Sequence, residues 1–276
     1  MSDSSAIELQ PVLTQITIYP IKSLDGMIVD RSKVSAGGTL EFDRRWAIVD
    51  DRGKVVNAKR TAKIHQIRSQ FNLIESDRRL LVSLQTADRH PQTFCLLSEL
   101  AQLAKWLGNF FGFPVSIIKN PVTGFPDDSA AYGPTIASTA TLEAICEWFP
   151  GLDLAEVRRR FRTNLEVSNV PAFWEDRLFS TPGEVVDFQV GNVQFHGINP
   201  CQRCIVPTCN SLTGEVTAKF QQIFNHQRQQ TLPPAVSIAR FNHFYRLAIN
   251  TQIPLFEAGK FLNTGDRLNV SLRQDD

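Results

Sequence analysis

Short runs of alternating and β-branched residues predict β-strands along most of the chain. The first run, Val12 to Tyr19, stops at Pro20, which cannot donate a hydrogen bond to a sheet. Two further runs, Phe71 to Ile74 and Arg79 to Leu84, flank polar residues 75–77 and predict a hairpin. Other strand-like runs are residues 27–31, 45–49, 164–168, 185–190, 193–196, 214–220, 244–250 and 268–272. Their spacing of about 8 to 12 residues favours barrel-like β units.

Helical patterns are fewer than strand patterns. Residues Ser98 to Phe111 repeat apolar side chains at helical spacing, and Ser98 is the expected N-cap. Shorter helices are predicted for residues 141–149 and 154–160. The predicted fold class is therefore α+β and predominantly β, with a few helices beside the barrel-like units.

One segment between these patterns is rich in turn residues. Residues 119–134 hold three prolines, two glycines and the paired Asp127 and Asp128. Such a composition is typical of a loop. We interpret it as the join between two halves of the protein, or as a loop on the substrate side.

Composition and charge exclude several classes of protein. Of the 276 residues, 42% are hydrophobic and 21% are charged, so the chain is not an intrinsically disordered one. Lys and Arg number 29 against 28 Asp and Glu, which argues against bulk binding to nucleic acid or to an anionic membrane. No apolar run reaches about 18 residues, and no secretory signal is visible. Five cysteines, an odd number, indicate reduced thiols and a cytoplasmic location.

The densest candidate chemistry is a cysteine cluster. Cys201, Cys204 and Cys209 lie within nine residues, and His196 precedes them. These four side chains could form a structural zinc site. An iron–sulfur cluster would also need Cys95 or Cys146, which lie among apolar neighbours on apparent helical segments and are interpreted as buried thiols.

Two further hypotheses use fewer ligands. Cys201 and Cys204 could form a redox pair, but the residues that follow, 205–207, do not predict the helix start that lowers a thiol pKa. Alternatively, one thiolate holds a soft metal for which a cofactor supplies the other sulfurs. The neighbouring Arg203 would favour a thiolate and could also hold an anionic group of that cofactor.

Other charged groups have weaker signals. Glu175 and Asp176 are interpreted as a pair of which one holds a basic residue of the site in place. The run Arg158 to Arg160 is interpreted as a solvated helix end.

Six short strings, in one order along the chain, resemble a known family. They are Tyr19-Pro-Ile-Lys-Ser23, Asp43-Arg-Arg-Trp46, Phe161-Arg-Thr-Asn-Leu-Glu-Val167, Trp174-Glu-Asp176, the run Gly191 to Cys204 that ends in Pro-Cys-Gln-Arg-Cys, and Thr213-Gly-Glu215. The first two resemble the N-terminal β-barrel domain that accompanies MOSC domains, and the others resemble the MOSC domain itself. The resemblance implies an N-terminal β-barrel-like domain over residues 9–120 and a MOSC β-barrel, which binds a molybdenum cofactor, over residues 121–275.

In architecture the chain is most similar to the amidoxime-reducing components. This resemblance implies a molybdenum cofactor of the molybdopterin type and an oxidoreductase that reduces N-hydroxylated small molecules. Because the chain ends at Asp276 soon after the last predicted strand, we expect electrons to come from a separate donor protein, ferredoxin-like or cytochrome b5-like.

The resemblance also assigns site residues. Cys204 is the implied molybdenum ligand and catalytic residue. The implied cofactor-binding residues are Lys22, Ser23, Arg44, Arg162, Asn164, Gln202 and Arg203. The family often has Ser at the position of Gln202, so one hydrogen bond to the cofactor is expected to differ. The cationic members would offer fixed charge and N–H donors to a polyanionic cofactor.

Two other functions remain open. In the first, a sulfur-carrier or cofactor-handling protein, Cys204 carries sulfur as a persulfide. In the second, a zinc-stabilised binding module, Cys201 and Cys209 are needed as well as Cys204.

Overall fold

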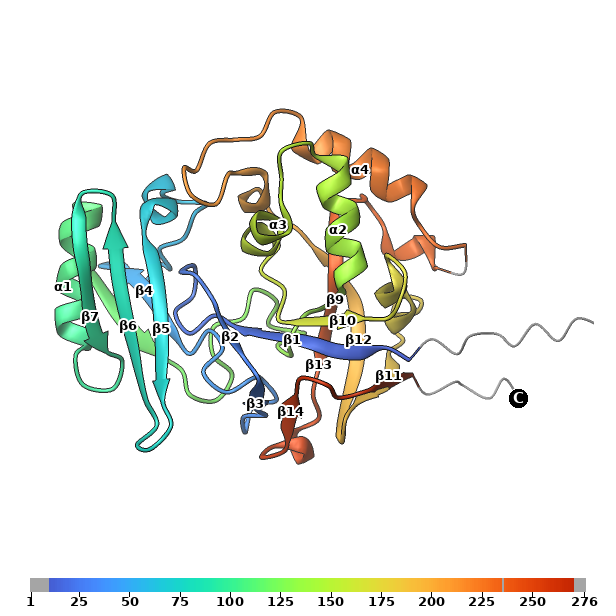
Figure 1. Ribbon diagram of the computed structural model, residues 1–276, viewed down its shortest axis with the longest axis horizontal. Helices are drawn as coiled ribbons and strands as arrows, with labels where there is room; N and C mark the ends of the chain where they lie inside the picture. The colour runs from blue at the N-terminus through green and yellow to red at the C-terminus, as the bar shows by residue number, and fades with distance from the viewer. Residues whose placement is uncertain (1–9, 235, 271–276) are drawn as a thin grey trace, which may run out of the picture.

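The largest element of the fold is a mixed eight-stranded sheet (Figure 1). The structure, a computed structural model, describes residues 10–234 and 236–270. The strand order is β15-β11-β12-β13-β9-β10-β1-β2. Their bounds are β1 Val12–Ile18, β2 Met27–Val29, β9 Ile136–Ser138, β10 Leu165–Ser168, β11 Val186–Val190, β12 Val193–Gln202, β13 Arg246–Gln252 and β15 Leu268–Val270. Strand β1 thus pairs with β10, a strand from the second half of the chain, and β2 pairs with β1 at the edge of the sheet.

The sheet curves so that its far ends approach each other. The backbone N–H of Leu13 donates to the carbonyl of Asp266 at 2.8 Å, and that of Leu268 donates to Pro11 at 2.9 Å. Among the described residues these bonds do not extend into a ladder that closes a complete barrel. The predicted boundary between residues 120 and 121 therefore separates strands that share one sheet.

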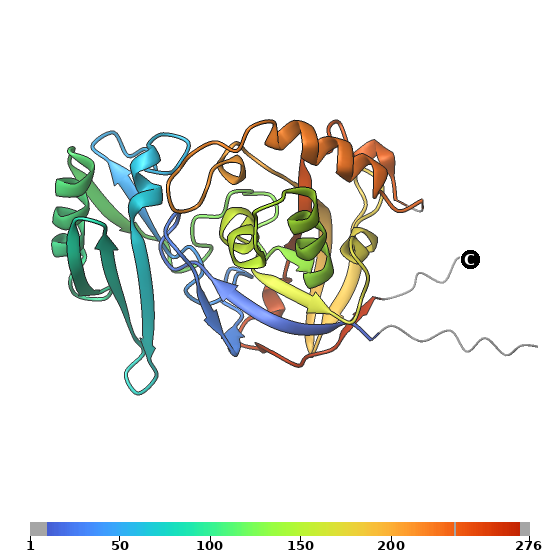
Figure 2. The ribbon, with the colours of Figure 1, turned by 45° about the horizontal axis from the view of Figure 1, so that its top comes forward.

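A smaller unit stands beside the large sheet (Figure 2). It contains a three-stranded antiparallel sheet, a two-stranded sheet and one helix. Their bounds are β5 Arg68–Ile74, β6 Arg79–Thr86, β7 Arg89–Cys95, β4 Trp46–Asp50, β8 Val115–Lys119 and α1 Leu100–Phe111. A further pair, β3 Arg31–Lys33 and β14 Phe261–Asn263, again joins an early segment to a late one. Helix α1 buries the apolar side chains of its stripe, Leu103, Trp106, Leu107 and Phe111.

Three helices gather at one end of the large sheet (Figure 1). They are α2 Thr139–Trp148, α3 Leu154–Phe161 and α4 Phe220–Gln230. Their apolar faces form a second core, in which the rings of Phe149 and Phe220 stack at 4.1 Å between centroids. Short 3-10 helices are η1 Ala62–Gln66, η2 Trp174–Leu178, η3 Val206–Thr208, η4 Ile238–Arg240 and η5 Leu255–Glu257. Within the described part of the chain, no helix combines the length and the apolar character needed to cross a membrane.

The predicted fold class, mixed and predominantly β, is confirmed, but several elements differ from the prediction. Residues 214–220 are not a strand: they lead into α4, whose sequence buries only Phe220, Phe224 and Arg228 and so lacks a wide apolar stripe. Cys95 ends strand β7 instead of lying on a helix. Helix α1 begins after Glu99, so the predicted cap at Ser98 is wrong.

A buried ionic network ties η2 to α4. Both carboxylate oxygens of Asp176 accept hydrogen bonds from Arg228 Nη2 at 2.6 Å, and both side chains are almost fully buried. The neighbouring Glu175 accepts from Thr141 Oγ1 at 3.0 Å. The prediction that this acidic pair holds a basic residue of the site is wrong, because its partner Arg228 lies in the core and outside the cavity described below.

Glu175 should make the stability of the protein depend on pH. Burial, and then the charge of Asp176, raises the pKa of its carboxyl group from 4.5 to about 7. The folded state therefore holds a proton that the unfolded state releases, and the free energy of unfolding should fall as pH rises from about 4.5 to 7. Glu175→Gln should remove this decline in urea unfolding at pH 5 and pH 8. The exposed Glu147→Gln on α2 is the control and should keep the wild-type pH dependence. An unchanged pH dependence in Glu175→Gln would contradict this assignment.

Candidate functional site

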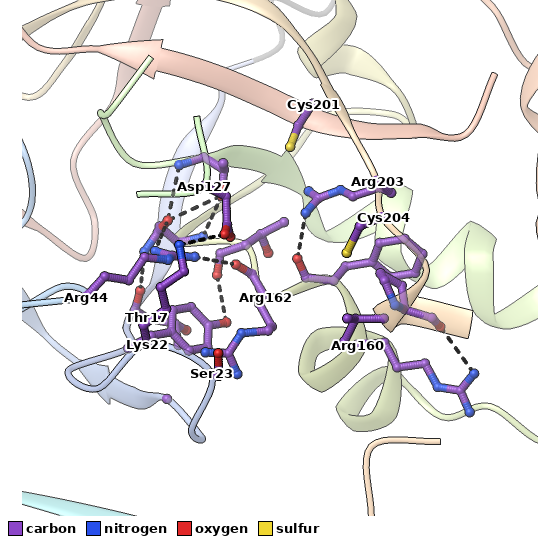
Figure 3. A pocket seen from close by; sticks show the side chains of 18 of the residues that line it. Thr17, Lys22, Ser23, Arg44, Asp127, Arg160, Arg162, Cys201, Arg203 and Cys204 are labelled. Atoms are coloured by element: carbon purple, nitrogen blue, oxygen red, sulfur yellow. Dashed lines mark hydrogen bonds and ion pairs between the residues drawn. The ribbon is translucent and has the colours of Figure 1, made fainter. Parts of the chain in front are cut away.

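A cavity of about 1420 Å³ lies between the smaller unit and the large sheet. Figure 3 shows part of its lining. The structure brings all eight predicted site residues to its wall: Lys22, Ser23, Arg44, Arg162, Asn164, Gln202, Arg203 and Cys204. Eleven Lys and Arg residues line it against five Asp and Glu residues. A chain of nearly balanced charge therefore concentrates positive charge around one space, which suits an anionic ligand.

Three of these residues have an unusual backbone conformation. Ser23, Arg44 and Arg162 have φ angles of 77°, 46° and 53°, in the left-handed region that residues other than glycine rarely adopt. Arg162 ends helix α3, and its N–H donates to the carbonyl of Arg158 at 2.9 Å. Such conformations persist only where the surroundings enforce them, and they are frequent at ligand sites.

Tyr19 packs against two of the cationic groups. The guanidinium carbon of Arg162 lies 4.1 Å from the centre of its ring, and that of Arg44 lies 5.0 Å away. The Tyr19 hydroxyl donates to the carbonyl of Thr163 at 3.1 Å. Burial raises the pKa of Tyr19 to about 12 in spite of the two guanidinium groups, so the ring remains neutral. In the sequence, Tyr19 is conspicuous only as the first residue of the string Tyr19 to Ser23, and this role of its ring was not predicted.

Asn164 fixes Arg44 and joins three segments. Its amide nitrogen donates to the carbonyl of Thr17 at 3.0 Å, and its Oδ1 accepts from Arg44 Nη1 and from the N–H of Thr135, both at 3.2 Å. The side chain is buried. Asn164 therefore acts within the protein as a positioning residue for Arg44, which also pairs with Asp43.

Arg203 is held entirely by neutral groups. Its Nε and Nη2 donate to the carbonyl of Leu247 at 3.0 and 2.7 Å, and its Nη1 donates to Phe161 at 2.9 Å. These bonds attach the loop that carries Cys204 to strand β13 and to the end of α3. Because carbonyls carry no net charge, the positive charge of Arg203 is uncompensated by them. The neighbouring Gln202 is exposed on the cavity wall.

Lys22 and Arg162 differ in how much of their binding capacity is free. Lys22 Nζ donates to the carbonyls of Phe125 and Pro126 at 2.9 and 3.1 Å and pairs with Asp127 at 2.8 Å. Its three N–H groups are therefore in use. The guanidinium of Arg162 has no hydrogen-bond or ion-pair partner among the residues that the structure describes. Burial lowers its pKa, but a guanidinium remains charged at neutral pH.

The first part of this chain matches a known protein family. Residues 10–112 match the MOSC N-terminal beta barrel domain. This segment of 103 residues is less than half of the chain. It supplies Lys22, Ser23 and Arg44 to the cavity, whereas the other five predicted site residues come from the remainder of the chain.

Similarity to whole proteins extends beyond the MOSC N-terminal segment. The chain is 21% identical to human molybdenum cofactor sulfurase over 262 residues, which is 79% of this chain and 29% of that protein. It is 26% identical to the molybdenum cofactor sulfurase of Drosophila persimilis over 255 residues, 76% of this chain and 30% of the relative. Identity to that of Caenorhabditis elegans is 22% over 286 residues, 95% of this chain and 36% of the relative. The chain thus spans about a third of the length of these relatives.

The cysteines do not form a protein-only metal site. Three cysteines that follow residues 10–112 in the chain line the cavity: Cys201, Cys204 and Cys209. Each is a free thiol and is partly exposed. Within residues 10–234 and 236–270, no group of three or more His, Cys, Asp or Glu side chains is placed to hold a metal ion. His196 instead pairs with Asp187, at 2.6 Å between Nδ1 and Oδ1. The zinc hypothesis therefore lacks its ligand set.

The arginine run on α3 is less solvated than predicted. Arg160 is buried, pairs with Glu156 at 2.7 Å and donates to Thr217 Oγ1 at 2.9 Å. Arg158 pairs with the buried Glu166 at 2.8 Å. The interpretation of this run as a solvated helix end is wrong for Arg160, which stabilises the segment that follows the cysteines.

Replacement of Asn164 should destabilise the protein. Asn164→Ala removes bonds to three segments and leaves buried groups unpaired, which should lower the free energy of unfolding by about 1–3 kcal/mol. Urea unfolding measures this. Asn109→Ala, at an exposed position of α1 in the MOSC N-terminal segment, should change stability by less than about 0.5 kcal/mol. If the two variants have the same free energy of unfolding, the hydrogen bonds of Asn164 make no net contribution to stability.

Proposed function

We propose that the cavity binds a molybdenum cofactor of the molybdopterin type through Cys204 and that the protein reduces N-hydroxylated compounds with it. One observation carries the proposal: a partly exposed thiol shares a wall with Arg162, whose guanidinium has no described hydrogen-bond partner, and with Arg203, whose described hydrogen-bond partners are all neutral. The similarity to proteins named molybdenum cofactor sulfurase supports a link to this cofactor.

The residues present fit such a group. A cofactor that ends in a phosphate needs unpaired donors and positive charge, which Arg162 and the surplus of cationic side chains offer. A metal held by one protein thiolate needs its other ligands from the cofactor, and the protein offers no competing cluster of ligands in its described part. The volume of the cavity is also sufficient for a ligand of this size.

The residues of the chain then have distinct tasks. The bound cofactor would supply the redox chemistry. Cys204 would hold the metal, and Arg203 would keep the loop of Cys204 in place through its bonds to Leu247 and Phe161. Arg162 would bind the phosphate end of the cofactor. Tyr19 orients the guanidinium of Arg162, and Asn164 orients that of Arg44. Electrons would come from a separate ferredoxin-like or cytochrome b5-like protein.

The names of the relatives support a second candidate function, handling of the cofactor. Proteins that carry the name molybdenum cofactor sulfurase suggest that the chain handles the cofactor, with Cys204 carrying sulfur as a persulfide. The same cavity would then hold the cofactor as a substrate. Metal analysis separates the two: about one molybdenum per purified chain supports the reductase, and a thiol-bound sulfur without molybdenum supports the carrier.

Cys204 should be the only cysteine on which metal retention depends. Protein produced with ample molybdate should contain molybdenum and pterin, and Cys204→Ser should lose the metal while its thermal unfolding stays close to wild type. Cys201→Ser and Cys209→Ser are matched controls on the same wall and should retain most of the metal. If Cys209→Ser loses as much metal as Cys204→Ser, the single-thiolate hypothesis fails.

Arg162 should contribute directly to cofactor affinity. Arg162→Met keeps much of the packing on Tyr19 but removes the free donors, so cofactor dissociation should increase by about ten- to a hundredfold. Release of the pterin into buffer, followed by fluorescence, measures this. Arg79→Met, at the exposed first position of strand β6 and outside the lining of the cavity, should release the cofactor at the wild-type rate. Equal rates in both variants would exclude Arg162 from the binding site.

A further inference from the structure

We propose that Asp127 sets the charge selectivity of the cavity. It acts as an internal anion on Lys22, so that a ligand must carry a dianionic group, such as a phosphate monoester, to displace it. The inference rests on the proposed function only in taking the phosphate of the cofactor as the natural dianion.

Lys22 has no free capacity while Asp127 is in place. Its ammonium donates to two backbone carbonyls, of Phe125 and Pro126, and its third contact is the Asp127 carboxylate at 2.8 Å. The backbone contacts hold the ammonium in position, and only 15% of the Lys22 side chain is exposed. A ligand anion can therefore reach Lys22 only by replacing Asp127.

Asp127 itself is held by little else. Its side chain is 80% exposed on the cavity wall, and its second carboxylate oxygen has no hydrogen-bond partner among the described residues. Figure 3 shows this carboxylate between Lys22 and Arg203. Desolvation raises its pKa, but Lys22, Arg44 and Arg162 outweigh this effect and lower it to about 2. Asp127 is therefore an anion at neutral pH.

The backbone before Asp127 is fixed, so displacement requires only a side-chain rotation. The N–H of Phe125 donates to the carbonyl of Arg44 at 2.8 Å, and that of Asn120 donates to Arg45 at 2.9 Å. Gly124 has a φ of 62°, and a Cβ there would lie 2.7 Å from the carbonyl oxygen of Asp43. This close packing keeps the loop on the cationic cluster when its carboxylate turns away.

The exchange selects ligands by charge. A monoanion that replaces Asp127 on Lys22 restores the same ion pair and gains little, while it is repelled by the displaced carboxylate nearby. A dianion brings one more charge to Lys22, Arg44 and Arg162 and gains from the unpartnered guanidinium of Arg162. The cavity should therefore bind phosphate monoesters and reject phosphate diesters and carboxylates.

Binding of two small phosphate esters tests this. Methyl phosphate is a dianion at pH 8, and dimethyl phosphate is a monoanion. By titration calorimetry at low salt, the wild-type chain of 276 residues, freed of any pterin, should bind methyl phosphate at least tenfold more tightly than dimethyl phosphate. Asp127→Asn should bind methyl phosphate about tenfold more tightly than wild type and should discriminate less between the two esters.

Matched variants separate this effect from a general change of charge. Both oxygens of the next residue, Asp128, are bonded within the protein, to the N–H of Ala130 at 2.9 Å and to Asn250 at 3.2 Å. Asp128→Asn removes the same charge and should change affinity by less than about twofold. Lys22→Met should abolish the gain from Asp127→Asn in the double variant. Asp127→Ser serves as a second replacement of the carboxylate, and thermal unfolding checks that each variant is folded.

The proposal is overturned if Asp127→Asn and Asp127→Ser bind methyl phosphate no better than wild type, or if Asp128→Asn gives the same gain. Metal and pterin content is measured on the protein as purified, and calorimetry follows removal of any pterin, because a resident phosphate would occupy the site. Absence of molybdenum in the purified protein removes the reductase, whereas absence of the Asp127 effect in the cofactor-free protein removes the inference alone.

Discussion

The packing of two guanidinium groups on the ring of Tyr19 is the interaction on which the site depends. Arg44 comes from the N-terminal segment and Arg162 from the end of α3, and like charges of this kind repel each other in a desolvated space. The ring face attracts both, and Asn164 and Asp43 fix the orientation of Arg44. The left-handed backbone at both arginines is the conformational cost of this arrangement.

The sheet explains why the two halves of the chain act as one site. Strand β1 pairs with β10, so that Thr17 of β1 bonds to the carbonyl of Asn164, just before β10, and Tyr19, just after β1, reaches the carbonyl of Thr163. The cationic residues are therefore placed by a ladder between segments about 150 positions apart, Ile16 facing Leu165. A cavity assembled in this way keeps its geometry only while the eight-stranded sheet is intact.

Local patterns in the sequence predicted most strands of the sheet, the hairpin of β5 and β6, and helix α1, because these depend on near neighbours. They missed the three-residue strand β9 and the second half of β12. They did not predict α4, whose polar sequence becomes helical by packing Phe220 and Phe224 against α2 and α3. The motif strings identified residues that line one cavity. They could not indicate that Lys22 is saturated or that Arg203 is bound to carbonyls, since those partners lie far along the chain.

The two candidate functions share one binding problem and differ in the chemistry at Cys204. A reductase and a cofactor-handling protein both need to bind a polyanion beside a thiol, and the cationic surplus serves either. They also differ in how firmly the anion must be retained. Asp127 weakens retention by competing for Lys22, which would suit a protein that exchanges its ligand, whereas the free guanidinium of Arg162 strengthens it. If the proposed function holds, the balance between these two side chains, one anion and one cation on the same wall, would set whether the cofactor is resident or transient.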